Sequence, residues 1–105
     1  MSLARDLFLG FVKLHILYHA GQEPVYGLWL IDELSRHGYQ LSPGTLYPML
    51  HGLEEEGLLA DEKRVVDGKQ RKYYRLTDAG RQALAQGRDK ARELLDEIAQ
   101  KEDRK

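Results

Sequence analysis

The sequence predicts a mainly α-helical protein with a two-stranded β-hairpin, arranged as a winged helix-turn-helix followed by a long C-terminal helix. Three observations predict it. Apolar residues recur at helical spacing in three segments before residue 57. Asp67-Gly68, a strong hairpin turn, separates two β-type segments. A heptad-like seam follows Thr77. We expect a winged-helix domain over 1–76, whose first helix also joins a dimer interface, and a dimerisation helix over 77–105.

The first helix is expected over 3–19 and is apolar on two sides. One stripe contains Leu7, Phe11, Leu14 and Tyr18, and the opposite stripe contains Leu9, Val12 and Ile16. A chain of 105 residues has little with which to cover both stripes. We therefore predict that the stripe of Leu9, Val12 and Ile16 contacts a second copy of the chain.

The second helix is expected from Tyr26 to about His37. Leu30, Ile31 and Leu34 point inward in this helix, and Gly38 ends it. Its less apolar side carries Trp29, the only tryptophan.

The third helix begins in the segment "SPGTLYPML", where Ser42 suits the N-cap and Pro43 the first helical position. A core stripe follows at helical spacing: Leu46, Met49, Leu50 and Leu53. The opposite face is Gly44, Pro48, His51 and Glu55, flanked by Thr45 and Tyr47. Since the helix start offers unpaired N–H groups beside hydroxyls, this face is suited to DNA. Tyr47 is interpreted as a phosphate contact, with packing beside Leu46 as the alternative.

The hairpin, expected over Leu58–Val66 and Lys69–Leu76, is rich in positive charge. Between residues 63 and 75 there is one acid, Asp67, and six bases: Lys63, Arg64, Lys69, Arg71, Lys72 and Arg75. A local basic patch is typical of a protein that binds phosphate groups. The alternative is that these charges only keep the hairpin solvated and bind no phosphate, because the net charge of the chain is −1 and acidic residues directly precede the patch. Tyr73 and Tyr74 should face opposite sides, one in the core and the other a platform for Arg75.

The last helix is capped by Thr77 and carries a narrow seam rich in small residues. Its members are Gly80, Leu84, Gly87, Ala91, Leu94 and Ile98. Such a stripe is typical of a helix that packs on a partner helix. We predict a two-fold dimer through the part of this seam from Leu84 to Ile98.

The segments "SPGTLYPMLHGLEEEGLL" and "RKYYRLTDAGR" resemble the PadR family of bacterial transcriptional regulators, and "VYGLWLIDEL" resembles its second-helix motif. The resemblance covers about residues 5–81. It implies a short-form, dimeric winged-helix repressor that is released from its operator by a small ligand or a stress signal. The one candidate ring for an aromatic ligand pocket is Trp29, for which a structural role against the partner is the favoured interpretation.

The predicted contacts to double-stranded DNA come from the third helix and the hairpin. In the third helix they are Ser42, Gly44, Thr45, Tyr47, Pro48 and His51, with Pro48 suited to a thymine methyl group. In the hairpin they are Lys63, Arg64, Lys69, Arg71 and Lys72. The alternative is a dimeric winged-helix interaction module that does not bind DNA.

Other classes of function are disfavoured. The chain has no cysteine, which excludes disulfides and thiolate chemistry. His15 and His19 are four residues apart, but no third metal ligand is evident, so we expect no metal and no cofactor. Glu54, Glu55 and Glu56 are interpreted as a solvated face without a catalytic partner. No signal peptide or spanning segment is recognisable, and we expect a cytoplasmic protein that is not an enzyme.

Overall fold

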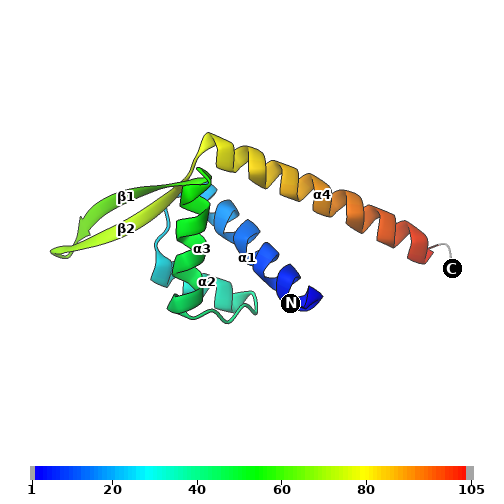
Figure 1. Cartoon of the computed structure of the whole chain (residues 1–105), viewed down its shortest axis with the longest axis horizontal. Coiled ribbons are helices and arrows are strands. Elements are labelled where there is room, and N and C mark those ends of the chain that lie inside the picture. The colour runs from blue at the N-terminus through cyan, green and yellow to red at the C-terminus, as the bar shows by residue number, and fades with distance from the viewer. Residues whose placement is uncertain (1, 104–105) are drawn as a thin grey trace.

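The structure, a computed structural model that describes residues 2–103, has four helices and one hairpin in the predicted order. The elements are α1 (Leu3–Gln22), α2 (Gly27–Arg36), α3 (Pro43–Glu55), β1 (Leu59–Val66), β2 (Lys69–Leu76) and α4 (Asp78–Asp103). Helices α1, α2 and α3 form the body, from which the hairpin and α4 project at opposite ends (Figure 1). The predicted winged helix-turn-helix with a long C-terminal helix is confirmed.

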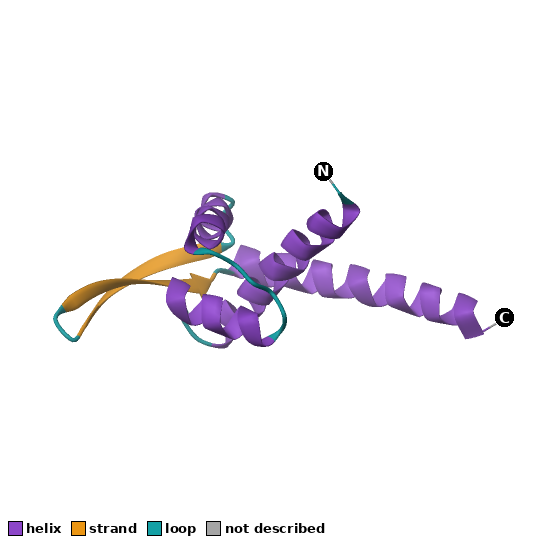
Figure 2. Cartoon of the chain, turned by 90° about the horizontal axis from the view of Figure 1, so that it is seen from below, coloured by secondary structure: helices purple, strands orange, loops and turns teal. Residues whose placement is uncertain are grey.

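The ends of the elements follow local signals in the sequence. Ser42 has the extended backbone of an N-cap and Pro43 occupies the first turn of α3. Asp67 and Gly68 both have positive φ, at 52° and 76°, as the tight turn between the paired strands β1 and β2 requires (Figure 2). The hydroxyl of Thr77 accepts a hydrogen bond of 3.0 Å from the Gly80 amide and thereby caps α4.

A short backbone pairing fixes the base of the hairpin on the body. The amide of Val25, between α1 and α2, donates to the Tyr74 carbonyl at 2.9 Å, and the Tyr74 amide donates back to the Val25 carbonyl at 2.7 Å. The Tyr74 ring is buried, whereas Tyr73 on the other face is partly exposed, as the alternation predicted. The hairpin of β1 and β2, hereafter the wing, therefore projects from the body in a direction that these backbone hydrogen bonds determine.

The structure corrects the assignment of the two stripes of α1. Val12 and Ile16 are fully buried inside the protomer, and Leu9 is half-buried. The exposed apolar residues of α1 are Leu3, Leu7, Phe11 and Tyr18. The stripe of Val12 and Ile16 turns toward the protomer's own core, so these two residues are not available to a partner.

The seam of α4 is likewise divided between two environments. Leu84 packs against the core, and a Cβ added at Gly87 would lie 2.7 Å from Leu14 Cδ2 of α1. The first part of the seam therefore packs on α1 of the same chain, contrary to prediction. Leu94 and Ile98 are 56% and 47% exposed, on the part of α4 that extends beyond the body (Figure 1). No helix within residues 2–103 is long and apolar enough to cross a membrane.

Candidate nucleic-acid interface

The outer face of α3 is the first part of the candidate interface. Gly44, Pro48 and His51 are exposed, while Leu46 and Leu50 on the opposite face are fully buried. The predicted division of this helix into a core stripe and a free face is confirmed. At its start, the Ser42 hydroxyl donates to the Thr45 hydroxyl at 3.3 Å. Both hydroxyls belong to the N-cap and first turn of α3, the end at which a helix favours an anion.

Tyr47 is held by α2 rather than by its neighbour Leu46. Its side chain is 37% exposed, and its ring fills the space where a Cβ at Gly27 would stand. Gly27 is the first residue of α2, so its missing side chain allows the two helices of the helix-turn-helix to approach closely. The ring thus has a packing role, and its predicted phosphate contact remains a prediction.

Two arginines on the outer face of the wing lie on tyrosine rings. The Arg64 guanidinium lies 4.6 Å from the ring centroid of Tyr73, and the Arg71 guanidinium 4.2 Å from that of Tyr26. The two rings meet edge to face at 5.3 Å. Tyr73 therefore supports Arg64 and not Arg75, which was the expected residue. Arg64 lies opposite Arg71 in the strand register. These stacked contacts restrict the arginines while leaving their charge in place.

Tyr26 is a residue of this interface that sequence reasoning missed. It precedes α2 as its N-cap residue and reaches the wing only because the Val25 pairing brings the two segments together. No local pattern carries that information, since Tyr26 and Tyr73 are far apart in the sequence.

Lys72, one of the predicted DNA contacts of the hairpin, is paired with acids of its own protomer. Its Nζ lies 3.2 Å from Glu54 Oε1 on α3 and 3.9 Å from Asp61 Oδ2 on β1. Burial lowers the pKa of Lys72, but the hydrogen bond to Glu54 and the proximity of Tyr74 outweigh it and leave that pKa above its usual value. Lys72 therefore joins the wing to α3.

The exposed lysines of the wing are Lys63 and Lys69. Within the part of the chain that the structure describes, neither forms an ion pair, whereas Arg64 is bonded to Glu62 at 2.6 Å. Both side chains are therefore available to a phosphate group.

Trp29 is part of its own protomer's packing. It lies against the core, and its ring meets His19 of α1 edge to face at 5.5 Å. It also borders a hollow of about 220 Å³ that Arg64 and Tyr73 line. The expected contact with a partner's last helix is not needed to account for its burial.

Comparisons with known proteins agree with this geometry. Residues 16–86 match the model of the transcriptional regulator PadR-like family. Transcriptional regulator Rv3488 of Mycobacterium tuberculosis is 59% identical over 87 residues, which are 83% of this chain and 81% of that protein. The crystal structure of a PadR family transcriptional regulator from Eggerthella lenta superposes with a TM-score of 0.81 at 35% identity, covering 94% of this chain and 88% of that one. A PadR-like transcriptional regulator from Bacillus cereus gives 0.81 at 30% identity, covering 90% and 94%.

These relatives are regulators of transcription and not enzymes, and DNA binding is expected of such a family. With a family match over residues 16–86 and a relative of 59% identity, the chain belongs to the PadR-like family of transcriptional regulators.

Proposed function

We propose that the protein is a homodimeric repressor that binds a palindromic operator and is controlled by a small effector. The observation that most supports DNA binding is the exposed face of α3 beside a wing with unpaired lysines. Lys72 connects the two elements through Glu54, so that they act on DNA as one unit. In this arrangement α3 enters the major groove and the wing contacts the backbone.

Helix α3 and the wing contribute differently to DNA binding. Residues 42–57 contain no lysine or arginine, so the contacts of α3 are short and come from hydroxyls, His51 and backbone amides. Such contacts distinguish base sequences but release few counterions. The lysines of the wing neutralise phosphates and thus supply affinity on any sequence.

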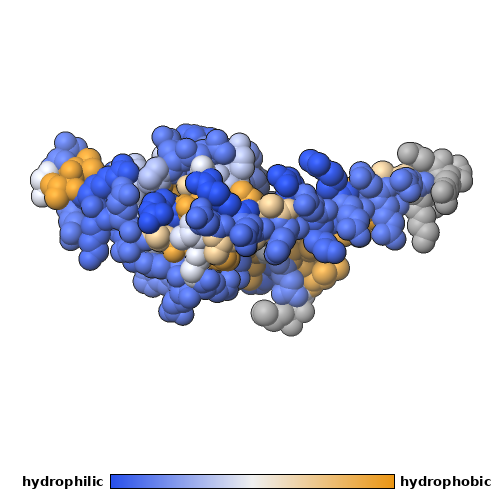
Figure 3. All heavy atoms as spheres, turned by 90° about the horizontal axis from the view of Figure 1, so that it is seen from above, coloured by the Kyte–Doolittle hydropathy of each residue, from blue (hydrophilic) through white to orange (hydrophobic). Residues whose placement is uncertain are grey.

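Dimerisation uses the apolar surface that the protomer leaves open. Phe11 and Tyr18 of α1 border a cavity of about 310 Å³ together with Leu84 of α4. Leu94, Leu95 and Ile98 continue this apolar surface along α4 and are about half exposed. Figure 3 shows apolar side chains gathered beside the base of the projecting helix. A second copy covers such a surface most simply by a two-fold contact, in which each α4 packs against the partner's α1.

Selection of duplexes from a random library tests the proposal, because the protein itself then chooses the operator. We expect enriched palindromes with half-sites about one helical turn, or a multiple of it, apart. Light scattering should give twice the chain mass of 12.1 kDa. A reporter gene behind the selected site should be silenced when the protein is present.

Two results would contradict this function. If no sequence is enriched, and DNA binding is weak and independent of salt concentration, the alternative function would be favoured. In that alternative the protein is an interaction module that dimerises but does not bind DNA. Increased reporter expression would identify an activator.

A further inference from the structure

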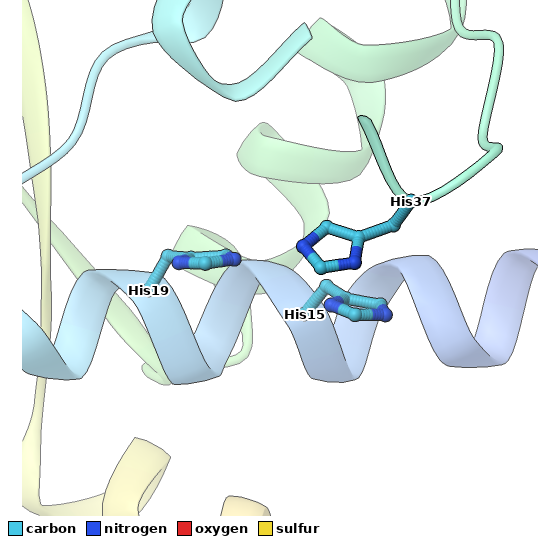
Figure 4. Close-up of side chains that lie close together, drawn as sticks. All are labelled: His15, His19 and His37. Carbon is cyan, nitrogen blue, oxygen red and sulfur yellow. The ribbon is translucent and has the colours of Figure 1, made fainter. Parts of the chain in front are cut away.

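Three histidines meet beside the groove between α1 and α4. His15 and His19 lie one turn apart on α1, and His37 follows the last residue of α2 (Figure 4). One ring nitrogen of each lies within 4.8 Å of those of the other two. His37 is thus the third candidate ligand that the sequence did not reveal, because only the fold brings it to the pair on α1.

The arrangement is close to that of a tetrahedral metal site. With metal–nitrogen bonds of 2.0–2.1 Å, ligand nitrogens lie about 3.3 Å apart. These nitrogens, at most 4.8 Å apart, would each have to approach the others by about 1.5 Å or less. His37 has the freedom to do so, because it is exposed at the end of α2. A carboxylate is also at hand, since Glu33 Oε2 lies 3.1 Å from His37 Nε2.

One nitrogen of the cluster has no hydrogen-bond partner within residues 2–103 and is free to bind a ligand. His19 Nε2 is buried and has no hydrogen-bond partner among the described residues. A buried polar atom without a partner is costly, and a bound ion would satisfy it. Burial, followed by the neighbouring His37 and His19, lowers the pKa of His15; burial also lowers the pKa of His19. Both imidazoles are thus favoured in the neutral form that coordinates metals.

The charges around the cluster are compatible with a cation. Glu33 on α2 bonds His37 through Oε2 and Arg36 through Oε1, and Arg36 is also paired with Asp32. Arg88 of α4 lines the cavity of about 310 Å³ that the three histidines also line. Its charge is partly offset, because its Nε is bonded to Asp89 Oδ1 at 3.1 Å. We propose that His15, His19 and His37, with Glu33 as fourth ligand or as a hydrogen-bond partner of His37, bind a divalent transition-metal ion of the zinc type.

The donor set selects the class of ion. Three imidazoles suit zinc, nickel, cobalt and copper, whereas magnesium and calcium prefer oxygen ligands. Zinc is the appropriate probe because a site of three histidines and a carboxylate or water is one of its usual arrangements.

The position of the site gives the ion a role in regulation, an inference that rests on the proposed function. Only residues 38–41 separate His37 from Ser42, the N-cap of α3. An ion bound to both His37 and α1 fixes this connection, and with it the start of the DNA-reading helix. Because α1 also offers the apolar face proposed for dimerisation, the ion is placed to couple the partner to the operator.

Zinc titration of the full chain, first freed of metal with a chelator, tests the site by calorimetry. We expect one zinc ion per chain, bound more tightly than about 10 μM, and no heat from magnesium. His15→Ala and His37→Ala should each weaken binding by at least about tenfold. His51→Ala is the matched control, because His51 is the fourth histidine of the chain and lies exposed on α3. His37→Gln, which keeps a polar side chain at the end of α2, guards against loss of fold.

Fluorescence of Trp29 gives an independent readout. This only tryptophan lies 5.5 Å from the His19 ring, so nickel bound at the cluster should quench its emission, and excess zinc should restore it. The His37→Ala variant should show no quenching at the concentration that saturates the wild type.

Regulation is measured on a library-selected duplex with and without zinc. We expect at least a fivefold change of affinity for the wild type and none for His37→Ala. Absence of saturable zinc binding, or equal binding by the wild type and the His15 and His37 variants, would overturn the site. Zinc binding that leaves DNA affinity unchanged would overturn the regulatory role alone. Since the titration contains no DNA, failure of the site and failure of DNA binding are seen separately.

Discussion

The phenol ring of Tyr47 lies against the backbone of Gly27, where any other residue at position 27 would place its Cβ. The contact joins the start of α2 to the exposed side of α3. It explains why a glycine follows Tyr26 at the beginning of a helix, where a glycine otherwise costs stability. The orientation of α3 relative to α2 therefore depends on glycine at position 27.

Gly27→Ala should lower the free energy of unfolding by about 1–3 kcal/mol, because the added methyl overlaps the Tyr47 ring. Urea unfolding followed by circular dichroism measures it. Gly52→Ala on α3 is the matched control: its Cβ would have nothing within 4 Å, so we expect no loss. Adding Tyr47→Ala to Gly27→Ala should remove most of the penalty of the glycine change. If the two changes are additive, the overlap is not the cause.

The sequence predicts the ends of elements well because those signals are local. Pro43, Asp67-Gly68 and Thr77 each favour a backbone conformation through their own chemistry. Ser42 has the backbone of an N-cap, but its side chain forms no capping hydrogen bond. The free face of α3 was predictable for a similar reason, since one apolar stripe identifies the side that must be buried.

Contacts between distant segments were not predictable. Both stripes of α1 are apolar, so periodicity cannot tell whether Val12 or Phe11 faces the core, and the structure reverses the expected choice. The ion pairs of Lys72 and the approach of His37 to His15 depend on how helices and hairpin pack. No spacing in the sequence encodes either contact.

The proposed dimer surface predicts which apolar residues tolerate a charge. Phe11→Glu and Ile98→Glu should each give monomers, because a two-fold contact places each new charge at two buried positions. Val65→Glu is the control: Val65 is 74% exposed but lies on the wing. Light scattering at micromolar concentration should show the single-chain mass of 12.1 kDa for the first two variants and twice that for the control. Dimers in all three variants would place the interface elsewhere.

Lys69 and Lys72 are both wing lysines, but the structure predicts different effects on DNA binding. Lys69 is exposed and has no ion pair among the described residues. Lys69→Ala should therefore reduce the salt slope, which is the steepness with which the logarithm of DNA affinity falls with the logarithm of salt concentration. The reduction is about 0.9 for each phosphate that is no longer neutralised, and a dimer doubles it. Lys72 is already paired with Glu54, so Lys72→Ala should leave the slope nearly unchanged and loosen the wing. Anisotropy of a labelled duplex at several salt concentrations measures both slopes. An equal decrease for both variants would show that Lys72 leaves its partners to bind phosphate.

The exposed face of α3 should determine which sequences are preferred. Thr45 and His51 lie on this face with side chains that can hydrogen-bond base edges; the Thr45 hydroxyl also accepts from Ser42 at 3.3 Å, and His51 is exposed. Thr45→Ala or His51→Ala should therefore cost about 1–3 kcal/mol on the selected duplex and much less on unrelated DNA. The salt slope should be retained, because neither change removes a wing lysine. Competition between selected and random duplexes measures the preference. If either variant lost affinity equally on all sequences, its side chain would contact the backbone, and the wing would have to contribute to sequence preference.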